Sequence, residues 1–371
     1  MMANWGNVEL GSICEVVRGG SPRPIIDYIT DEPDGVNWLK IGDVKETDKY
    51  FTHANEKIKP SGIPKTREVK AGELILSNSM SFGRAFITLI DGYIHDGWLR
   101  LRCDESKLDK EYLYYFLTSN LAQSQFKAIA TGSVVNNLKS DTVKAVKIAL
   151  PTLGEQKRIA EVLSMFDDKI KCNEEVNKNL QEQAQVIYND MFITNANPSW
   201  QSGQLSDLIT VRYGKDHKKL ADGTYPVYGS GGIMRYVERP LYDKESVLIP
   251  RKGTLNNVMY VNEPFWSVDT MFFTEMKLPN VAKFVFHFVK SIDLVALNAG
   301  SAVPSMTTDI LNAMELLIPD SDTLTKFENV VAPMYLTVQQ NTQESSKLAE
   351  LRDSLLPRFM SGELDVSNLD L

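Results

Sequence analysis

Cysteine and histidine are scarce in this sequence, and both are scattered. The three cysteines, at positions 14, 103 and 172, stand far apart without a CxxC pair, and the four histidines are equally dispersed. This usage predicts neither a disulfide framework nor a metal centre, and it is typical of a protein in a reducing, cytoplasmic setting.

Long apolar runs are also missing. No run approaches the roughly 20 residues that span a bilayer, and the first residues, MMANWGNVEL, lack a basic region followed by an apolar one. We therefore expect neither a membrane span nor a secretory signal. The sequence also has no Walker motif, no GxSxG and no paired His–carboxylate spacing, so it offers no catalytic constellation.

Two short stretches match catalytic patterns only loosely. Residues 197–200, NPSW, are similar to the N-P-P-aromatic motif of amino-methyltransferases but lack its second proline. Pro33-Asp34 and Asp43-Val44-Lys45 fit the PD…(D/E)xK pattern of nucleases, which arises often by chance. A linker and a solvated strand edge explain them better, and a self-contained methyltransferase or nuclease stays an alternative.

The net charge of −8 is unevenly distributed. Residues 1–152 carry 19 acidic and 19 basic side chains, and residues 195–319 carry 12 of each. The excess lies in residues 153–194, with eight acidic and five basic, and in residues 320–371, with nine and four. Because residues 1–152 and 195–319 are neutral, the net negative charge of the whole chain does not exclude that these two regions bind a nucleic acid.

The chain repeats itself. Residues 131–151, TGSVVNNLKSDTVKAVKIALP, align with residues 299–319, AGSAVPSMTTDILNAMELLIP, at a shift of 168. The shift is 195 near the start of each copy, where Gly19 matches Gly214, and 173 in the middle, where Asp96 matches Asp269. Matching ends around a variable interior predict one duplicated domain with different specificity loops.

A heptad pattern follows each copy. Its positions are Ile159, Phe166, Asn173, Leu180 and Ile187 in the first copy and Phe327, Met334, Asn341, Leu348 and Leu355 in the second. Sustained heptads with charged flanks indicate coiled-coil helices, and a polar seam residue fixes their register. We expect an antiparallel pair in which Asn173 faces Asn341. The alternative is two amphipathic helices that each pack on their own domain.

Two prolines complicate the second helix. Pro333 predicts either a kink or a helix that begins only near it, and Pro357 predicts its end.

The fold class that follows is α+β, with a pseudo-twofold internal repeat. Alternating or continuous apolar runs predict strands over residues 36–41, 73–76, 146–150, 247–250 and 258–261, and helices over 108–126 and 281–295. The expected organisation is a globular domain over residues 1–152, a helix over 153–194, a second domain over 195–319, a helix over 320–363 and a tail over 364–371.

Polar loops follow corresponding strands in both copies, at residues 77–84 and 251–257. Arginine and lysine suit guanine edges or phosphates, and asparagine suits adenine edges. The candidate DNA-contacting residues are Lys40, Asn78, Ser79, Arg84, Arg212, Lys215, Arg251, Lys252, Thr254, Asn256 and Asn257.

Two segments of the sequence resemble a known family. GEQKRIA at residues 154–160 opens the first long helix, and LRDSLLPRFMSGEL at residues 351–364 closes the second. Together with the duplicated organisation, they resemble the specificity (S) subunit of type I restriction-modification systems. Residues 320–327 depart from the pattern, because they lack the Glu-Gln pair of the first copy.

The resemblance implies a subunit without catalytic activity of its own. Each globular domain would be a target recognition domain that reads half of a split double-stranded DNA sequence, and the helices would be the spacer. Two methyltransferase (M) subunits would bring S-adenosylmethionine, and motor-nuclease (R) subunits would use ATP and magnesium. A protein-only scaffold of two adaptor domains on a coiled coil is the other alternative.

Overall fold

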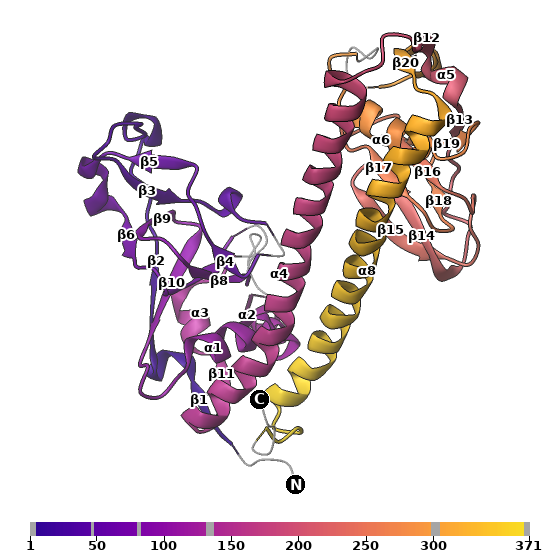
Figure 1. Cartoon of the computed structure of the whole chain (residues 1–371). Helices are drawn as coiled ribbons and strands as arrows, with labels where there is room; N and C mark the ends of the chain where they lie inside the picture. The colour runs from indigo at the N-terminus through magenta and orange to yellow at the C-terminus, as the bar shows by residue number, and fades with distance from the viewer. Residues whose placement is uncertain (1–4, 46–47, 80–82, 131–136, 298–304, 367–371) are drawn as a thin grey trace. The chain divides into compact units, whose positions relative to one another are not determined.

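The computed structural model describes residues 5–45, 48–79, 83–130, 137–297 and 305–366 (Figure 1). The chain divides into two compact units: unit 1 holds residues 1–172 and 343–371, and unit 2 holds residues 173–342. Among the residues that the structure describes, no helix is both long and apolar enough to cross a membrane.

The described residues of unit 1 form three sheets and three short α-helices. The sheets have the strand orders β1-β11, β2-β10-β7-β8-β4 and β5-β3-β9-β6. The strands are β1 (Gly6–Glu9), β2 (Cys14–Arg18), β3 (Val36–Leu39), β4 (Tyr50–Phe51), β5 (Glu56–Ile58), β6 (Arg67–Val69), β7 (Leu74–Ser77), β8 (Ala85–Thr88), β9 (Gly92–Ile94), β10 (Trp98–Cys103) and β11 (Lys147–Leu150). The short helices are α1 (Lys110–Thr118), α2 (Asn120–Ala130) and α3 (Ser140–Lys144).

Unit 2 is built in the same way with fewer strands. Its sheets have the orders β12-β20, β13-β19-β16-β17 and β15-β14-β18. The strands are β12 (Gln201–Gln204), β13 (Ile209–Tyr213), β14 (Asp222–Gly229), β15 (Gly232–Val237), β16 (Ser246–Pro250), β17 (Met259–Val261), β18 (Trp266–Ser267), β19 (Met271–Met276) and β20 (Glu315–Ile318). Its short helices are α5 (Leu205–Leu208), α6 (Ala282–Lys290) and α7 (Thr308–Asn312).

Strand registers show that the two units share one framework. Gly6 pairs with Leu150 in unit 1, and Gln201 pairs with Ile318 in unit 2, the positions that the sequence shifts of 195 and 168 equate. Leu99 opposite Leu76 corresponds in the same way to Phe272 opposite Ile249. The internal repeat of the sequence is therefore a repeat of strand pairing.

Two long helices contribute to both units. Helix α4 spans Leu153–Asn189, and helix α8 spans Ser321–Met360. The start of α4 and the end of α8 belong to unit 1, whereas the end of α4 and the start of α8 belong to unit 2.

Contacts between the helices run in opposite chain directions within each unit. In unit 1, Asp167 of α4 pairs with Arg352 of α8, and Lys169 lies 3.3 Å from Glu344. In unit 2, Asn173 Nδ2 lies 3.4 Å from the carbonyl oxygen of Asn341, and Asn341 Nδ2 donates to Asn177 Oδ1 at 2.9 Å. The Asn173 side chain thus contacts the main-chain carbonyl of Asn341.

The heptad positions divide into core and half-buried residues. Ile159 is fully buried in the core of unit 1, and Phe327 is fully buried in the core of unit 2. Leu355 packs against the first core, and Ile187 and Met334 pack against the second. The remaining apolar seam residues, Phe166, Leu180 and Leu348, are half-buried. The heptad residues near the helix ends therefore pack into the domain cores, whereas those in the middle of the helices are only half-buried.

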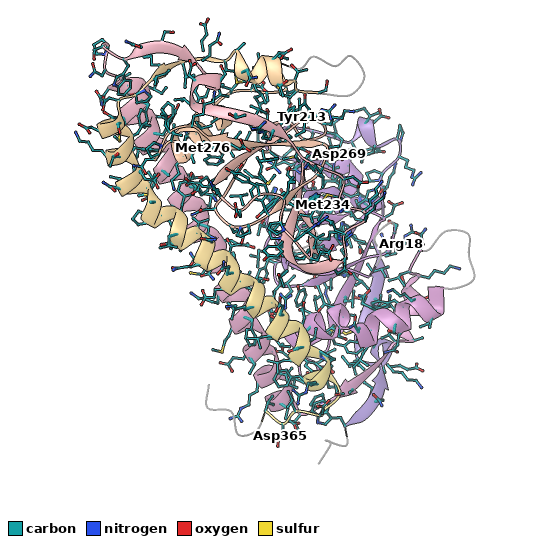
Figure 2. All side chains as sticks on the ribbon, turned by 90° about the vertical axis from the view of Figure 1, so that its right-hand side faces the viewer. Arg18, Tyr213, Met234, Asp269, Met276 and Asp365 are labelled. Atoms are coloured by element: carbon teal, nitrogen blue, oxygen red, sulfur yellow. A yellow bond between two sulfur atoms is a disulfide. The ribbon has the colours of Figure 1, made fainter. Side chains whose placement is uncertain are left out.

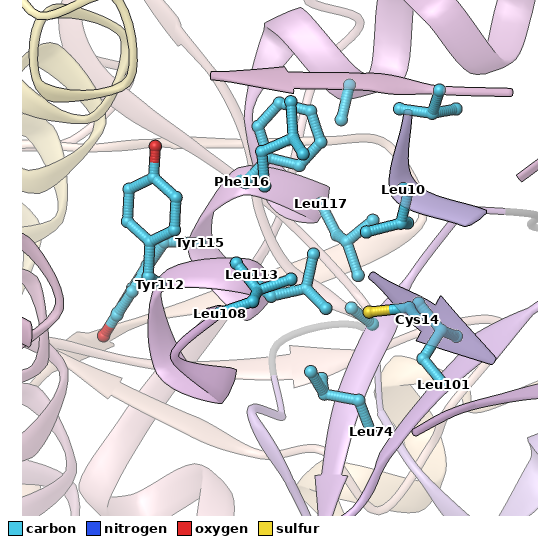
Figure 3. Packing of buried hydrophobic residues seen from close by; sticks show 14 of the residues in the cluster. Leu10, Cys14, Leu74, Leu101, Leu108, Tyr112, Leu113, Tyr115, Phe116 and Leu117 are labelled. Atoms are coloured by element: carbon cyan, nitrogen blue, oxygen red, sulfur yellow. The ribbon is translucent and has the colours of Figure 1, made fainter. Parts of the chain in front are cut away.

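The core of unit 1 lies between α1, the central strands and the ends of the long helices. Figure 3 shows Leu113 and Leu117 of α1 among Leu10, Cys14 and Leu101. Phe359 and Met360 at the end of α8 belong to the same buried cluster. Because these residues are all but inaccessible to water, the globular part of unit 1 depends on both helices for its apolar burial.

The two long helices start differently. In α4, the buried side chain of Gln156 accepts from Asp109 N at 2.8 Å and donates to the carbonyls of Lys107 and Pro151, both at 2.9 Å. The equivalent residue of α8 is Leu324, which cannot form these hydrogen bonds. Both helices have an N-cap: Thr152 accepts from Glu155 N at 3.3 Å before α4, and the equivalent Asp320 accepts from Thr323 N at 2.8 Å, so α8 starts at Ser321.

A helix start near Pro333 and a helix end at Pro357 were both wrong predictions. Helix α8 begins 12 residues before Pro333 and continues past Pro357. It ends at Met360, and Gly362 follows with a φ of 70°, the left-handed conformation common after a helix. Burial of Leu356, Phe359 and Met360 in unit 1 offsets the donor that Pro357 lacks.

The expectation of no disulfide was also wrong. The sulfur atoms of Cys14 and Cys103 are joined, because the two residues face each other on β2 and β10 although 89 positions separate them. In unit 2 the equivalent pair, Ile209 opposite Met276, is apolar. The spacing of cysteines in the sequence does not show which residues are neighbours across a sheet. With Cys14 and Cys103 joined, cysteine usage no longer supports a reducing compartment.

Other predicted elements agree with the structure apart from their ends. Strands β3, β7, β11, β16 and β17 lie where runs predicted them. The helix predicted over 108–126 is two helices, α1 and α2, because the chain is extended at Ser119. Residues 131–136 and 298–304, with Gly132, Ser133, Gly300 and Ser301 of the repeat, lie outside the described residues.

Gly19 allows a test of the shared framework. A Cβ at this position would lie 2.2 Å from the carbonyl oxygen of His95, on backbone that the sheet holds in place. We predict that Gly19→Ala lowers the free energy of unfolding by about 1–3 kcal/mol. Gly6→Ala is the control, since a Cβ there meets nothing within 4 Å. If denaturant titrations gave the two variants equal stability, the fold would not depend on the close approach of Gly19 to the His95 carbonyl.

His287 gives unit 2 a pH dependence. Its Nδ1 lies 2.8 Å from Gln185 Oε1 of α4 and its Nε2 lies 2.9 Å from the Tyr335 hydroxyl of α8. In the neutral ring, Nδ1 donates to Gln185 and Nε2 accepts from Tyr335. Burial, with a smaller effect of Lys290, lowers the pKa of His287 from 6.5 to about 3. The unfolded chain therefore binds a proton below pH 6.5 that the folded chain does not.

We predict that stability falls as the pH drops from 6.5 towards 3, by up to about 1.4 kcal/mol per pH unit from this histidine. Denaturant unfolding across this range, compared with His287→Gln, measures the contribution. The wild-type protein should lose stability more steeply than the variant, and parallel curves would exclude His287 as the cause.

Candidate nucleic-acid interface

Asn78 and Arg251 occupy equivalent places at the ends of β7 and β16. Asn78 N donates to the Gly97 carbonyl at 2.8 Å, and Arg251 N donates to the Thr270 carbonyl at 2.9 Å. Their own carbonyls accept from Leu138 N and Met306 N, both at 2.9 Å. The two polar loops predicted from the sequence therefore leave the same backbone position in each unit.

In unit 1, polar side chains gather around Asp96. The buried amide of Asn78 donates to the Asp96 carbonyl at 2.9 Å, and Arg18 Nε donates to the same oxygen at 2.9 Å. The Asp96 carboxylate accepts from the Ser21 hydroxyl at 3.0 Å and lies 3.3 Å from Arg23, whose side chain is 79% exposed. This cluster places two arginines at an exposed edge of unit 1.

Electrostatics keep the cluster charged. Burial raises the pKa of Asp96, but the Ser21 hydroxyl and the nearby His95, Arg18 and Arg23 outweigh it and lower that pKa overall. Burial, together with the surrounding cations, lowers the pKa of His95, against the opposing effect of Asp96. The site is therefore a carboxylate framed by arginines and a histidine biased towards its neutral form.

In unit 2, an arginine and an aromatic ring take the corresponding places. Arg251 Nη1 donates to the Asp269 carbonyl at 3.2 Å, and its guanidinium lies 5.4 Å from the centre of the Tyr213 ring. Tyr213 is 52% exposed at the end of β13. Figure 2 labels Arg18, Tyr213 and Asp269 on the ribbon. The loop after Arg251 turns at Gly253, with a φ of 87°, and Asn257 Nδ2 secures the β14–β15 hairpin by donating to the Ser230 carbonyl at 2.8 Å.

That hairpin exposes apolar side chains. Ile233, Met234 and Tyr236 of β15 are 49%, 61% and 48% exposed. Exposed apolar side chains beside basic residues suit contact with thymine methyl groups or base steps. They extend the polar loop of unit 2 into a mixed surface.

The remaining predicted residues fall into three groups. Lys215, Lys252 and Thr254 are exposed, whereas Ser79 is half-buried beside Gly97. Asn256 donates to Asp293 at 3.0 Å, Lys40 pairs with Glu56, and Arg212 lies 3.0 Å from Glu275, so these three are engaged within the protein. Arg84 lines a hollow of about 220 Å³ together with Asp48, Tyr114 and Gln123.

Sequence reasoning missed Arg18, Ser21, Arg23 and Tyr213. The signal was present, since Arg18 and Tyr213 directly precede Gly19 and Gly214, which the repeat equates. Those glycines are needed because a Cβ would lie 2.2 and 2.0 Å from the carbonyl oxygens of His95 and Val268. A residue beside an obligatory glycine on a shared framework is the natural position for variable contacts.

The two loose catalytic matches have structural explanations. Asp43 caps a short turn by accepting from Lys40 N at 2.9 Å, and it also accepts from Asn55 Nδ2 at 2.9 Å. Asn197 forms a local turn by accepting from Ser199 N at 3.0 Å. The described part of the chain holds no group of three or more His, Cys, Asp or Glu placed to bind a metal ion.

Comparisons with known proteins agree on one family. The model of the type I restriction modification DNA specificity domain matches residues 2–182 and 197–332, one match for each half of the chain. The type I restriction enzyme MjaIX specificity subunit of Methanocaldococcus jannaschii is 24% identical, over 99% of this chain and 95% of that protein. The EcoprrI specificity subunit of Escherichia coli is 20% identical over 76% of each chain.

A solved structure supports the same fold. The S subunit of a type I restriction-modification system from M. genitalium superposes with a TM-score of 0.60, at 20% identity and over 96% of each chain.

Proposed function

Because the chain belongs to the type I restriction-modification DNA specificity family, we propose that it is the non-catalytic subunit that reads a two-part DNA sequence. Each unit is a target recognition domain for one half of the sequence. The observation that carries this proposal is the shared framework with different side chains at equivalent positions, Arg18 and Asn78 in unit 1 against Tyr213 and Arg251 in unit 2.

Helices α4 and α8 are proposed to form an antiparallel coiled coil that sets the unread spacer. The opposed contacts of Asp167 with Arg352 and of Asn173 with Asn341 support this arrangement. A helix of 37 residues is about 55 Å long, and half-sites on one face of B-DNA lie about 34 Å apart per turn. The helices are therefore long enough to connect two readers one turn apart.

Partners complete the proposed activity. Two M subunits dock on this chain and methylate adenines with S-adenosylmethionine, and R subunits translocate and cut unmodified DNA with ATP and magnesium. The acidic exposed faces of α4 and α8 are poor surfaces for DNA and suit basic faces of M subunits. The complex works in the cytoplasm, where it meets chromosomal and invading DNA.

Exchange of one unit tests the proposal. Residues 1–172 and 343–371 form unit 1, so both segments are replaced together by those of another specificity subunit, which keeps the helix ends with their own core. With co-expressed M subunits, mapping of methylated adenines should show one half of the motif changed and the other half retained. The matched control replaces residues 173–342, and it should change the opposite half.

A change in both halves, or in neither, would contradict modular reading. Methylation or cleavage by the purified chain without partners would favour the self-contained enzyme. Absence of any sequence-specific DNA protection with M subunits present would favour the protein-only scaffold.

Matched insertions test the spacer. Seven residues added to α4 after Cys172, and seven to α8 after Thr342, preserve the heptad and lengthen each helix by about 10 Å. We predict that the complex no longer methylates sites with the original spacer. Insertion in α4 alone shifts its register and should abolish assembly, and retention of the original spacer by the matched variant would refute the spacer role.

A further inference from the structure

Positions 18 and 78 in unit 1 and positions 213 and 251 in unit 2 form equivalent pairs. Arg18 and Tyr213 end β2 and β13, and each precedes a glycine packed against a main-chain carbonyl. Asn78 and Arg251 follow β7 and β16 with the same main-chain hydrogen bonds. The backbone is thus held constant at both members of the pair, and only the side chains differ.

The two units place an arginine on opposite members of this pair. In unit 1 the β2 residue, Arg18, donates through Nε to the Asp96 carbonyl at 2.9 Å. In unit 2 the residue after β16, Arg251, donates through Nη1 to the equivalent carbonyl, that of Asp269, at 3.2 Å. One carbonyl therefore anchors an arginine in both units, although the arginine comes from a different strand.

In each unit, the second member of the pair stands where the other unit has its arginine: Asn78 is equivalent to Arg251, and Tyr213 is equivalent to Arg18. Asn78 shares the Asp96 carbonyl with Arg18, donating at 2.9 Å. Tyr213 lies under the Arg251 guanidinium, with its ring centre 5.4 Å away. An anchored or stacked guanidinium loses little conformational freedom when it binds, which favours specific contacts over loose ones.

Each anchored arginine retains unused donors. Among the described residues, Arg18 has both Nη groups left, and Arg251 has Nη2 and Nε. Within the described residues neither forms an ion pair with a carboxylate, whereas Arg100, Arg102 and Arg235 on nearby strands do. Two adjacent N–H groups match the O6 and N7 acceptors of guanine in the major groove.

We infer that Arg18 in unit 1 and Arg251 in unit 2 are the base-discriminating residues, each reading one guanine, and that buried Asn78 and stacked Tyr213 are the residues that position them. The inference rests on the proposed function. Because the two arginines approach from different strands, the guanine occupies a different position within each half-site.

Lysine substitutions separate base reading from phosphate binding. Arg18→Lys and Arg251→Lys keep the positive charge but lose the two-donor edge. The matched controls are Arg102→Lys in unit 1 and Arg235→Lys in unit 2, both engaged by carboxylates within the protein. Each full-length variant is co-expressed with M subunits, and affinity is measured on a library that varies every base of the motif at two salt concentrations.

The expected result is loss of discrimination at one position only. Arg18→Lys should reduce the preference for guanine at one position of the first half-site by roughly 5- to 150-fold and leave the second half-site unchanged. Arg251→Lys should do the reverse. Both controls should retain the wild-type motif.

Two results would overturn the inference. An unchanged motif would remove these arginines from base reading, and weaker binding to all sequences with a smaller salt dependence from Arg18→Ala and Arg251→Ala would make them phosphate contacts. If the wild-type complex selects no two-part motif, the proposed function itself fails, and that outcome is distinct from an unchanged motif in the variants.

Discussion

The burial of the helix ends is the constraint on which the rest of the structure depends. Ile159 near the start of α4 and Phe327 near the start of α8 are equivalent in the repeat, and each is fully buried in the core of its own unit. The opposite ends of the same helices, through Phe359 and Tyr188, complete the other unit's core. Neither globular part holds its full apolar core without both helices.

Buried charges add orientation to this packing. In unit 1, Lys49 pairs with Glu111 at 2.7 Å and contacts Ser164 of α4. In unit 2, Lys283 pairs with Glu245 at 2.8 Å and with Glu328 of α8 at 2.7 Å. Breaking a buried ion pair leaves an unpaired charge in the core, which destabilises the fold. Each network therefore favours one orientation of the globular part against the helices it packs on. An arrangement fixed in this way lets the exposed loops vary without moving the framework.

Much of this organisation was predictable from the sequence, because duplication leaves a signal that a single sequence carries. The matched Gly19 and Gly214, Asp96 and Asp269, and the two heptad series indicated two copies of one unit with long helices. What failed required knowledge of neighbours in space. Cys14 and Cys103 are distant in sequence but opposite in the sheet, and Pro357 stays helical because the residues around it are buried. At the site, residue type suggested Asn78 and Arg251, but only the strand ends bring Arg18 and Tyr213 beside them.

The central claim is that two units of one chain read two halves of one DNA target. The most direct measurement is a map of adenine methylation in the source genome, with this gene intact and deleted. The account predicts that deletion removes methylation from a single motif made of two specified parts and a fixed unspecified spacer. Unchanged methylation, or loss at a continuous motif without a spacer, would contradict it.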